Sequence, residues 1–167
     1  RANPARPNRT ASWRRPVSDF GDGSGMRYRA LDPADERLIA AAFDVIDRNY
    51  VRGRHHVGSA VRASSGGIYF GVHLESPGGD VCAEWVAIGS AVSAGEREIT
   101  ACVAVRRSGP GGTRPGVMSP CGACRELLTH YGPEAEVVVP TPAGPKKLSI
   151  AELLPIPYDQ NRPPEPT

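Results

Sequence analysis

Long apolar runs are missing from this chain of 167 residues. No stretch approaches the ~18 to 20 consecutive apolar residues that a membrane-spanning helix needs, and no signal peptide is visible. We therefore expect a soluble, cytoplasmic protein. Apolar residues make up 40% of the chain, while Gly and Pro are plentiful, at 19 and 17 residues. The length suffices for one domain with a hydrophobic core.

A basic stripe is also lacking from most of the chain. Residues 1–29 hold seven Arg and two Asp, whereas residues 30–167 hold thirteen Lys and Arg and sixteen Asp and Glu. The body is therefore mildly acidic, which argues against a nucleic-acid-binding surface. We interpret residues 1–30 as an Arg/Pro-rich N-terminal arm, residues 31–158 as the folded domain and residues 159–167 as a C-terminal tail.

Capping signals and apolar spacing predict alternating helices and strands. We expect helices that begin at residues 33, 82 and 121, and a short one after residue 149. We expect strands over residues 57–63, 68–74, 99–105, 136–139 and 146–148, and a loop over residues 106–116. This order favours an α/β fold, a three-layer α/β/α sandwich with a mixed five-stranded sheet.

Cysteine is scarce, and three of the four cysteines have metal-ligand spacing. Cys121 and Cys124 form a Cys-x-x-Cys pair at the start of one predicted helix, and Cys82 begins another. Two disulfides would be possible in a secreted protein, but nothing suggests secretion. Three protein ligands and one open position are typical of catalytic zinc, and positive helix N-termini favour thiolates. We interpret Cys102, in a predicted strand, as a buried core thiol.

Glu84 follows Cys82 by two residues, at the head of the apolar stretch "VCAEWVAIGSAV". A carboxylate beside a core is costly unless it is paired, bound or used. Next to zinc it can take a proton from water at the open position and deliver it to a substrate. We therefore predict one Zn²⁺ per subunit, with Glu84 as the catalytic proton carrier.

The two-part motif of Cys-Ala-Glu and, later, Pro-Cys-Gly-x-Cys resembles the signature of the zinc-dependent cytidine deaminase superfamily. The flanking stretches "HHVGSAVR", "GVHLES", "SPCGACRELLTHYGP" and "ELLPIPY" extend the resemblance over about residues 32–158. They are most similar to the blasticidin S deaminase branch, and ordinary cytidine deaminases come next. Most deaminases that edit nucleic acids have His at the first ligand position, where this chain has Cys82.

The resemblance implies zinc-dependent hydrolysis of a cytosine nucleoside at C4, which gives the uracil nucleoside and ammonia. It implies that Cys82, Cys121 and Cys124 bind the zinc and that Glu84 shuttles the proton. It also implies a cytidine deaminase-like fold and a homotetramer in which neighbouring chains complete each pocket.

The same resemblance implies which residues surround the pyrimidine ring of the substrate. The backbone near Ala83 and Ser119 would hold its edge, and Pro120 would shape the pocket. Tyr158 follows the last helix, where the C-terminal segment of the family can close the site. Arg125 would either bind a zinc thiolate or face solvent.

The chain departs from cytidine deaminases on the sugar side. In that family an Asn-x-Glu at the end of the hairpin binds the ribose hydroxyls; here His73 replaces Asn, while Glu75 matches. His55 and His56 stand near the position of a base-stacking Phe. Trp85 replaces an Arg that offsets thiolate charge, and we expect it in the core or at a subunit interface. These changes favour a modified cytosine nucleoside, such as one of the blasticidin S type.

Several functions stay open on this reading. The alternative substrates are cytidine and deoxycytidine, as in pyrimidine salvage. A second alternative is a non-catalytic module that holds structural zinc and binds a nucleoside. A third is an RNA-editing deaminase anchored by the basic arm, although the acidic body disfavours it.

Overall fold

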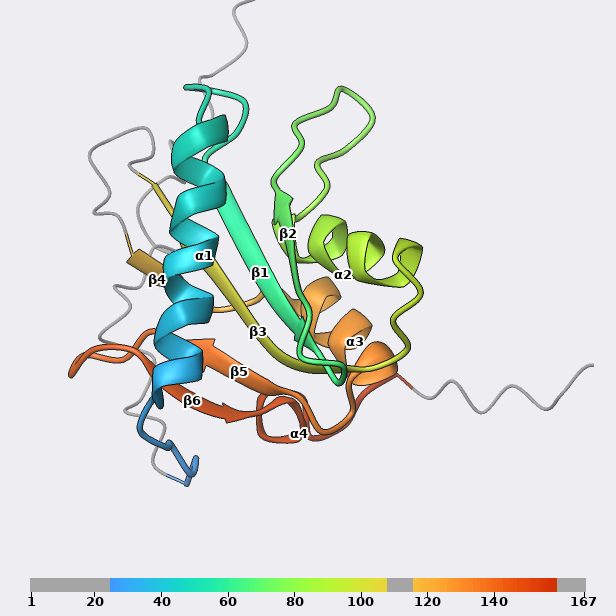
Figure 1. The fold of residues 1–167 in the computed structure, drawn as a ribbon. Helices are drawn as coiled ribbons and strands as arrows, with labels where there is room; N and C mark the ends of the chain where they lie inside the picture. The colour runs from blue at the N-terminus through green and yellow to red at the C-terminus, as the bar shows by residue number, and fades with distance from the viewer. Residues whose placement is uncertain (1–24, 108–115, 159–167) are drawn as a thin grey trace, which may run out of the picture.

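The structure, a computed structural model, describes residues 25–107 and 116–158 (Figure 1). Most of the predicted N-terminal arm and all of the predicted C-terminal tail lie outside these residues. The elements follow in the order α1 (Pro33–Asn49), β1 (Val57–Ala63), β2 (Ile68–Val72), α2 (Ala83–Ser93), β3 (Ile99–Arg106), β4 (Gly116–Met118), α3 (Gly122–Tyr131), β5 (Glu136–Val139), β6 (Lys146–Ser149) and α4 (Ile150–Leu153). Among the described helices, none combines the length and hydrophobicity needed to cross a bilayer.

The strands form one mixed sheet in the order β2-β1-β3-β5-β6, with β4 added beside β3. The β3–β5 pair is parallel and the other pairs are antiparallel. The described sheet thus has six strands, where the sequence predicted five. β5 pairs with β3 only at Ala101 and Cys102, so the rest of that edge is open to β4, which pairs at residues 104–106. β4 was missed because it is short and adjoins a Gly/Pro-rich stretch.

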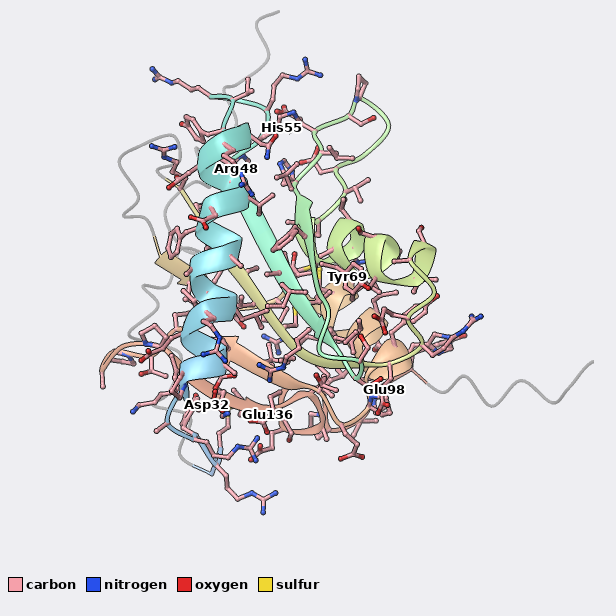
Figure 2. The ribbon with its side chains drawn as sticks, viewed as in Figure 1. Asp32, Arg48, His55, Tyr69, Glu98 and Glu136 are labelled. Atoms are coloured by element: carbon pink, nitrogen blue, oxygen red, sulfur yellow. The ribbon has the colours of Figure 1, made fainter. Side chains whose placement is uncertain are left out.

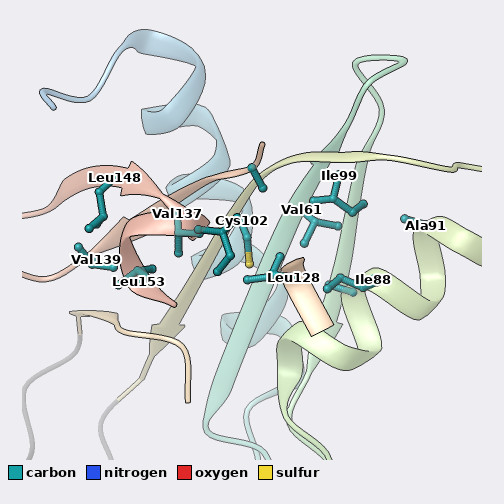
Figure 3. Packing of buried hydrophobic residues seen from close by; sticks show 13 residues of the cluster. Val61, Ile88, Ala91, Ile99, Cys102, Leu128, Val137, Val139, Leu148 and Leu153 are labelled. Atoms are coloured by element: carbon teal, nitrogen blue, oxygen red, sulfur yellow. The ribbon is translucent and has the colours of Figure 1, made fainter. Parts of the chain in front are cut away.

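Helices cover both faces of the sheet, which confirms the predicted three layers (Figure 1). α1 packs on one face, over a cluster that includes Ala101, Val103 and Val138. α2, α3 and α4 pack on the other face, over a cluster that includes Cys102 and Val137. Alternate residues of β3 and β5 thus point to opposite layers. Figure 3 shows the Cys102 thiol inside the second cluster, which confirms it as a core residue.

Two helices begin one residue after a cysteine. Cys82 is the N-cap of α2 and Cys121 is the N-cap of α3, both with extended backbone and no side-chain cap hydrogen bond. Their thiols are therefore not used to cap their own helices, although Ser, Thr, Asp and Asn usually do this at the N-cap position. The fold places these two sulfur atoms at positive helix ends, where a thiolate is stabilised.

Gly71 allows β2 to lie directly against the first turn of α2. A Cβ atom at this position would overlap the backbone carbonyl of Ala83 and the backbone nitrogen of Ala87. These backbone atoms cannot yield unless the whole helix shifts. We expect Gly71→Ala to lower the free energy of unfolding by about 2 kcal/mol, measured by urea denaturation.

Gly89 provides the matched control for this prediction. It lies within α2, and a Cβ atom there would meet nothing within 4 Å. Gly89→Ala should raise the free energy of unfolding by about 0.5 to 1 kcal/mol, because Ala has the higher helix propensity. Equal effects of the two substitutions would contradict the close approach of β2 and α2.

Candidate metal centre and active site

A small apolar cluster brings the candidate site together at one end of the sheet. Val57, Ala83, Ala104 and Met118 pack against one another. Val57 begins β1, Ala83 begins α2, and Met118 ends β4 just before α3. Their packing therefore joins the segments that carry His56, Glu84 and Ser119.

The three cysteines predicted as ligands form a compact group of sulfur atoms. The Sγ atom of Cys121 lies 3.7 Å from that of Cys82 and 3.4 Å from that of Cys124. All three sulfur atoms lie within 4.8 Å of one another. Two sulfur ligands of one tetrahedral zinc, each about 2.3 Å from the metal, lie about 3.8 Å apart. The geometry therefore fits zinc held by three thiolates.

The three thiols differ in their ease of ionisation. Burial raises the pKa of Cys82 and of Cys124. Burial also opposes ionisation of Cys121, but hydrogen bonds from the Cys124 backbone and from the two neighbouring thiols outweigh it and lower the pKa of Cys121. Cys121 is also the exposed member of the group. The Cys121 thiol therefore ionises more readily than the other two.

Glu84 lies beside this group in the first turn of α2 and is only 5% exposed. Burial raises the pKa of its carboxyl and outweighs two hydrogen bonds that lower it, one with its own backbone and one with the Cys124 thiol. A carboxyl beside a metal site can take a proton from water and pass it to a substrate. The arrangement can therefore combine a metal with a proton carrier.

Arg125 binds the segment that precedes Cys121. Its Nε atom donates to the Pro120 carbonyl at 3.0 Å, and one terminal nitrogen donates to Ser119 Oγ at 3.1 Å. The other terminal nitrogen donates to the Leu153 carbonyl at 3.0 Å. The sequence predicted that Arg125 would either bind a zinc thiolate or face solvent. Its hydrogen bonds instead go to two backbone carbonyls and one hydroxyl.

His73 is buried and ties two loops together. Its Nδ1 atom donates to the Arg54 carbonyl at 3.1 Å, and its Nε2 atom lies 3.4 Å from a carboxylate oxygen of Asp80. Its own carbonyl accepts a hydrogen bond from His55 Nδ1 at 2.8 Å. A contact between the His73 ring and a substrate would require the loss of one of these two interactions, with the Arg54 carbonyl or with Asp80. Figure 2 shows His55 at the end of the molecule opposite Asp32 and Glu136.

His56 differs from its two histidine neighbours. Its ring lies 4.6 Å from the His73 ring, centroid to centroid. Its buried Nδ1 atom has no hydrogen-bond partner among the described residues. Burial, followed by the charges of His73 and Arg106, lowers the pKa of His56. The sequence suggested a pocket role for at least one histidine, and His56 is the one with an unpaired polar atom. Glu75 is exposed in the loop between β2 and α2.

Trp85 and Tyr158 are both exposed. Trp85 is 44% exposed, so its predicted place in the core of this chain is wrong, and the subunit interface and the pocket remain. It lines a groove of about 440 Å³ with Glu126, Leu127 and Tyr131, between α2 and α3. Tyr158 is 77% exposed. Its backbone N–H donates to both carboxylate oxygens of Glu126, at 3.1 Å each.

Comparison with known proteins gives relatives that are all named as deaminases. A family model described as the cytidine and deoxycytidylate deaminase zinc-binding region matches residues 32–140. Blasticidin-S deaminase from Bacillus cereus is 40% identical over 140 residues, which cover 81% of this chain and 100% of the relative. Cytidine deaminase from Sporosarcina psychrophila is 34% identical over 99 residues, or 58% of this chain and 68% of the relative.

Solved structures agree with this match. The crystal structure of cytidine deaminase from Mycobacterium leprae superposes with a TM-score of 0.61 at 30% identity, and covers 75% of this chain and 100% of that one. The enzyme from Burkholderia pseudomallei gives 0.60 at 31% identity, over 74% and 98%. The fold, the cysteine group and the residues matched by the family model all indicate the same family. The chain therefore belongs to the cytidine and deoxycytidylate deaminase family and is a zinc-dependent hydrolytic deaminase.

Proposed function

We propose that this enzyme deaminates a cytosine nucleoside at C4 and prefers a modified nucleoside of the blasticidin S type. The observation that carries the proposal is the buried carboxyl of Glu84 beside three sulfur atoms that fit one zinc ion. One relative matched over its whole length, at 40% identity, is named as a blasticidin-S deaminase. Cytidine and deoxycytidine are the alternative substrates, supported by the other named relatives.

The three cysteines and Glu84 have separate chemical roles in this proposal. Cys82, Cys121 and Cys124 would hold zinc, which supplies Lewis acidity and an activated water when bound. The Glu84 carboxylate takes a proton from the attacking water and passes it to N3 of the pyrimidine. It then carries the second proton to the departing amine. The water oxygen replaces the amino nitrogen at C4, so the products are the uracil nucleoside and ammonia.

Substrate binding would use the surfaces around the metal. The backbone at Ala83 and Ser119 and the ring of Pro120 are proposed to hold the pyrimidine, because Ala83 precedes Glu84 and the other two directly precede Cys121. On the sugar side, the partly exposed ring of His56 and the exposed carboxylate of Glu75 are proposed to meet polar or cationic substituents. His55 and His73 are also proposed to line the substrate pocket, and their hydrogen bonds hold the surrounding loops.

A substrate comparison tests this proposal. We expect zinc-loaded protein to show a higher kcat/KM for blasticidin S than for cytidine or deoxycytidine, measured as the loss of cytosine absorbance. Preference for cytidine would instead indicate a salvage enzyme in which Glu75 suffices on the sugar side. If the zinc-loaded protein deaminates none of the three substrates, the result would contradict the proposed substrate class.

We also propose a cytoplasmic homotetramer that does not act on nucleic acids. The family resemblance supports the tetramer, and exposed apolar side chains such as Trp85, Ile156 and Tyr158 are suited to subunit contacts. The thiol ligands suit a reducing compartment. Light scattering should give four chains per particle. A fully active monomer would contradict this assembly.

A further inference from the structure

Arg125 connects the candidate pocket to a distant segment of the chain. We call residues 119–120 the pocket wall and residues 153–158 the C-terminal strap. Arg125 donates two hydrogen bonds to the pocket wall and a third to Leu153, the first residue of the strap. We infer that Arg125 is a positioning residue, which fixes the pocket wall and the C-terminal strap against α3 at the same time.

Glu126, the next residue of α3, holds the other end of the strap. Its carboxylate accepts the backbone N–H of Tyr158, the last residue of the strap. Two consecutive residues of the helix that carries Cys124 therefore fix both ends of the C-terminal strap. Most of the strap between these ends is exposed, with Ile156 at 86%. Its first end is also held by Leu153, which packs in the core, and by the Leu154 N–H, which donates to the Ile150 carbonyl. The contacts of Leu153 with Arg125 and of Tyr158 with Glu126 join the strap to α3.

The pocket wall also depends on Arg125. Pro120 has no N–H to donate, so its carbonyl is its backbone hydrogen-bonding group, and this carbonyl accepts from Arg125. Ser119 is exposed, and its hydroxyl is held by the same guanidinium. A planar guanidinium reaches three acceptors at fixed angles, which a lysine ammonium cannot reproduce. Arg125 would therefore set where the wall lies relative to Cys121.

Arg125→Lys keeps the positive charge but removes the guanidinium group, whose three nitrogens donate these hydrogen bonds. We expect faster hydrogen exchange in peptides that cover both residues 116–122 and residues 151–158, because both anchors are weakened. If the pocket wall binds substrate, which rests on the proposed function, KM for a cytosine nucleoside should rise about tenfold, the effect of losing one charged hydrogen bond. Zinc content and kcat should change little. The exposed Arg97 in the turn before β3 gives the control, Arg97→Lys, which should change none of these.

Glu126→Gln separates the two anchors. It should speed exchange in residues 151–158 and leave residues 116–122 unchanged, because Arg125 is intact. Unchanged exchange in both peptides of Arg125→Lys would overturn the inference, as would zinc loss with an unchanged KM. If the wild-type protein deaminates no cytosine nucleoside but exchange rises as expected, the positioning role stands and the proposed function fails. If Arg125→Lys does not fold, the Glu126→Gln pattern decides: faster exchange in both peptides, or in neither, would overturn the two-anchor account.

Discussion

Glu84→Gln should lower kcat on a cytosine nucleoside by about a thousandfold, while zinc stays bound at one ion per chain. General acid–base catalysis contributes roughly 10² to 10⁴ in rate, and we propose that one carboxyl serves both proton transfers. The amide has nearly the same shape and can still form hydrogen bonds, but it cannot carry the proton. Steady-state kinetics and metal analysis of the same preparation measure the two quantities.

Glu98→Gln is the control for this substitution. Glu98 is exposed in the turn before β3, and Figure 2 places it at the end of the molecule away from His55. Its replacement should leave kcat unchanged. A Glu84→Gln protein that keeps both its zinc and its full activity would show that the proton is carried elsewhere.

Cys82→Ala should weaken zinc binding by more than about a hundredfold and reduce deaminase activity to background. Binding of structural zinc by thiolates and imidazoles is worth on the order of 10 kcal/mol or more, so each ligand contributes several. Cys82 is one of three sulfur atoms that lie within 4.8 Å of one another. Competition with a chromophoric chelator measures the affinity.

Cys102→Ala is the matched control, because it removes a cysteine outside the metal group. Cys102 is 1% exposed and packs in the core under α2 and α3. We expect a loss of about 1 kcal/mol of stability from the lost sulfur contacts and an unchanged zinc stoichiometry. Zinc loss in Cys102→Ala, or full zinc in Cys82→Ala, would contradict the assignment of ligands.

Local spacing in α2 is enough to predict that Glu84 is buried. The same spacing would also have predicted that Trp85 is exposed. Glu84, Ala87, Ile88 and Ala91 are all buried and recur at helical intervals on one face of α2. This stripe brings the carboxyl inward beside Cys82. Trp85 follows immediately and lies off the stripe, which is why it is exposed despite its apolar ring. Reading it as a core residue gave hydrophobicity more weight than position.

The interactions that sequence reasoning missed are those between distant segments. Arg125 donates to Leu153, 28 residues away, and His73 binds the Arg54 carbonyl, 19 residues away. Helical periodicity and capping signals span only a few residues, so they locate cysteines at helix starts but not the partners of Arg125. β4 was missed for a related reason. Its three residues form a strand because of the open edge of β3, and this edge is created by tertiary structure.

The most direct test is product analysis with zinc-loaded wild-type protein and a panel of cytosine nucleosides that includes blasticidin S, cytidine and deoxycytidine. Our account predicts ammonia and the uracil nucleoside in equal amounts from at least one substrate, and a rate about a thousandfold lower for Glu84→Gln. Zinc-saturated protein that releases no ammonia from any member of the panel would contradict the account, and would point instead to a deaminase fold that only binds nucleosides.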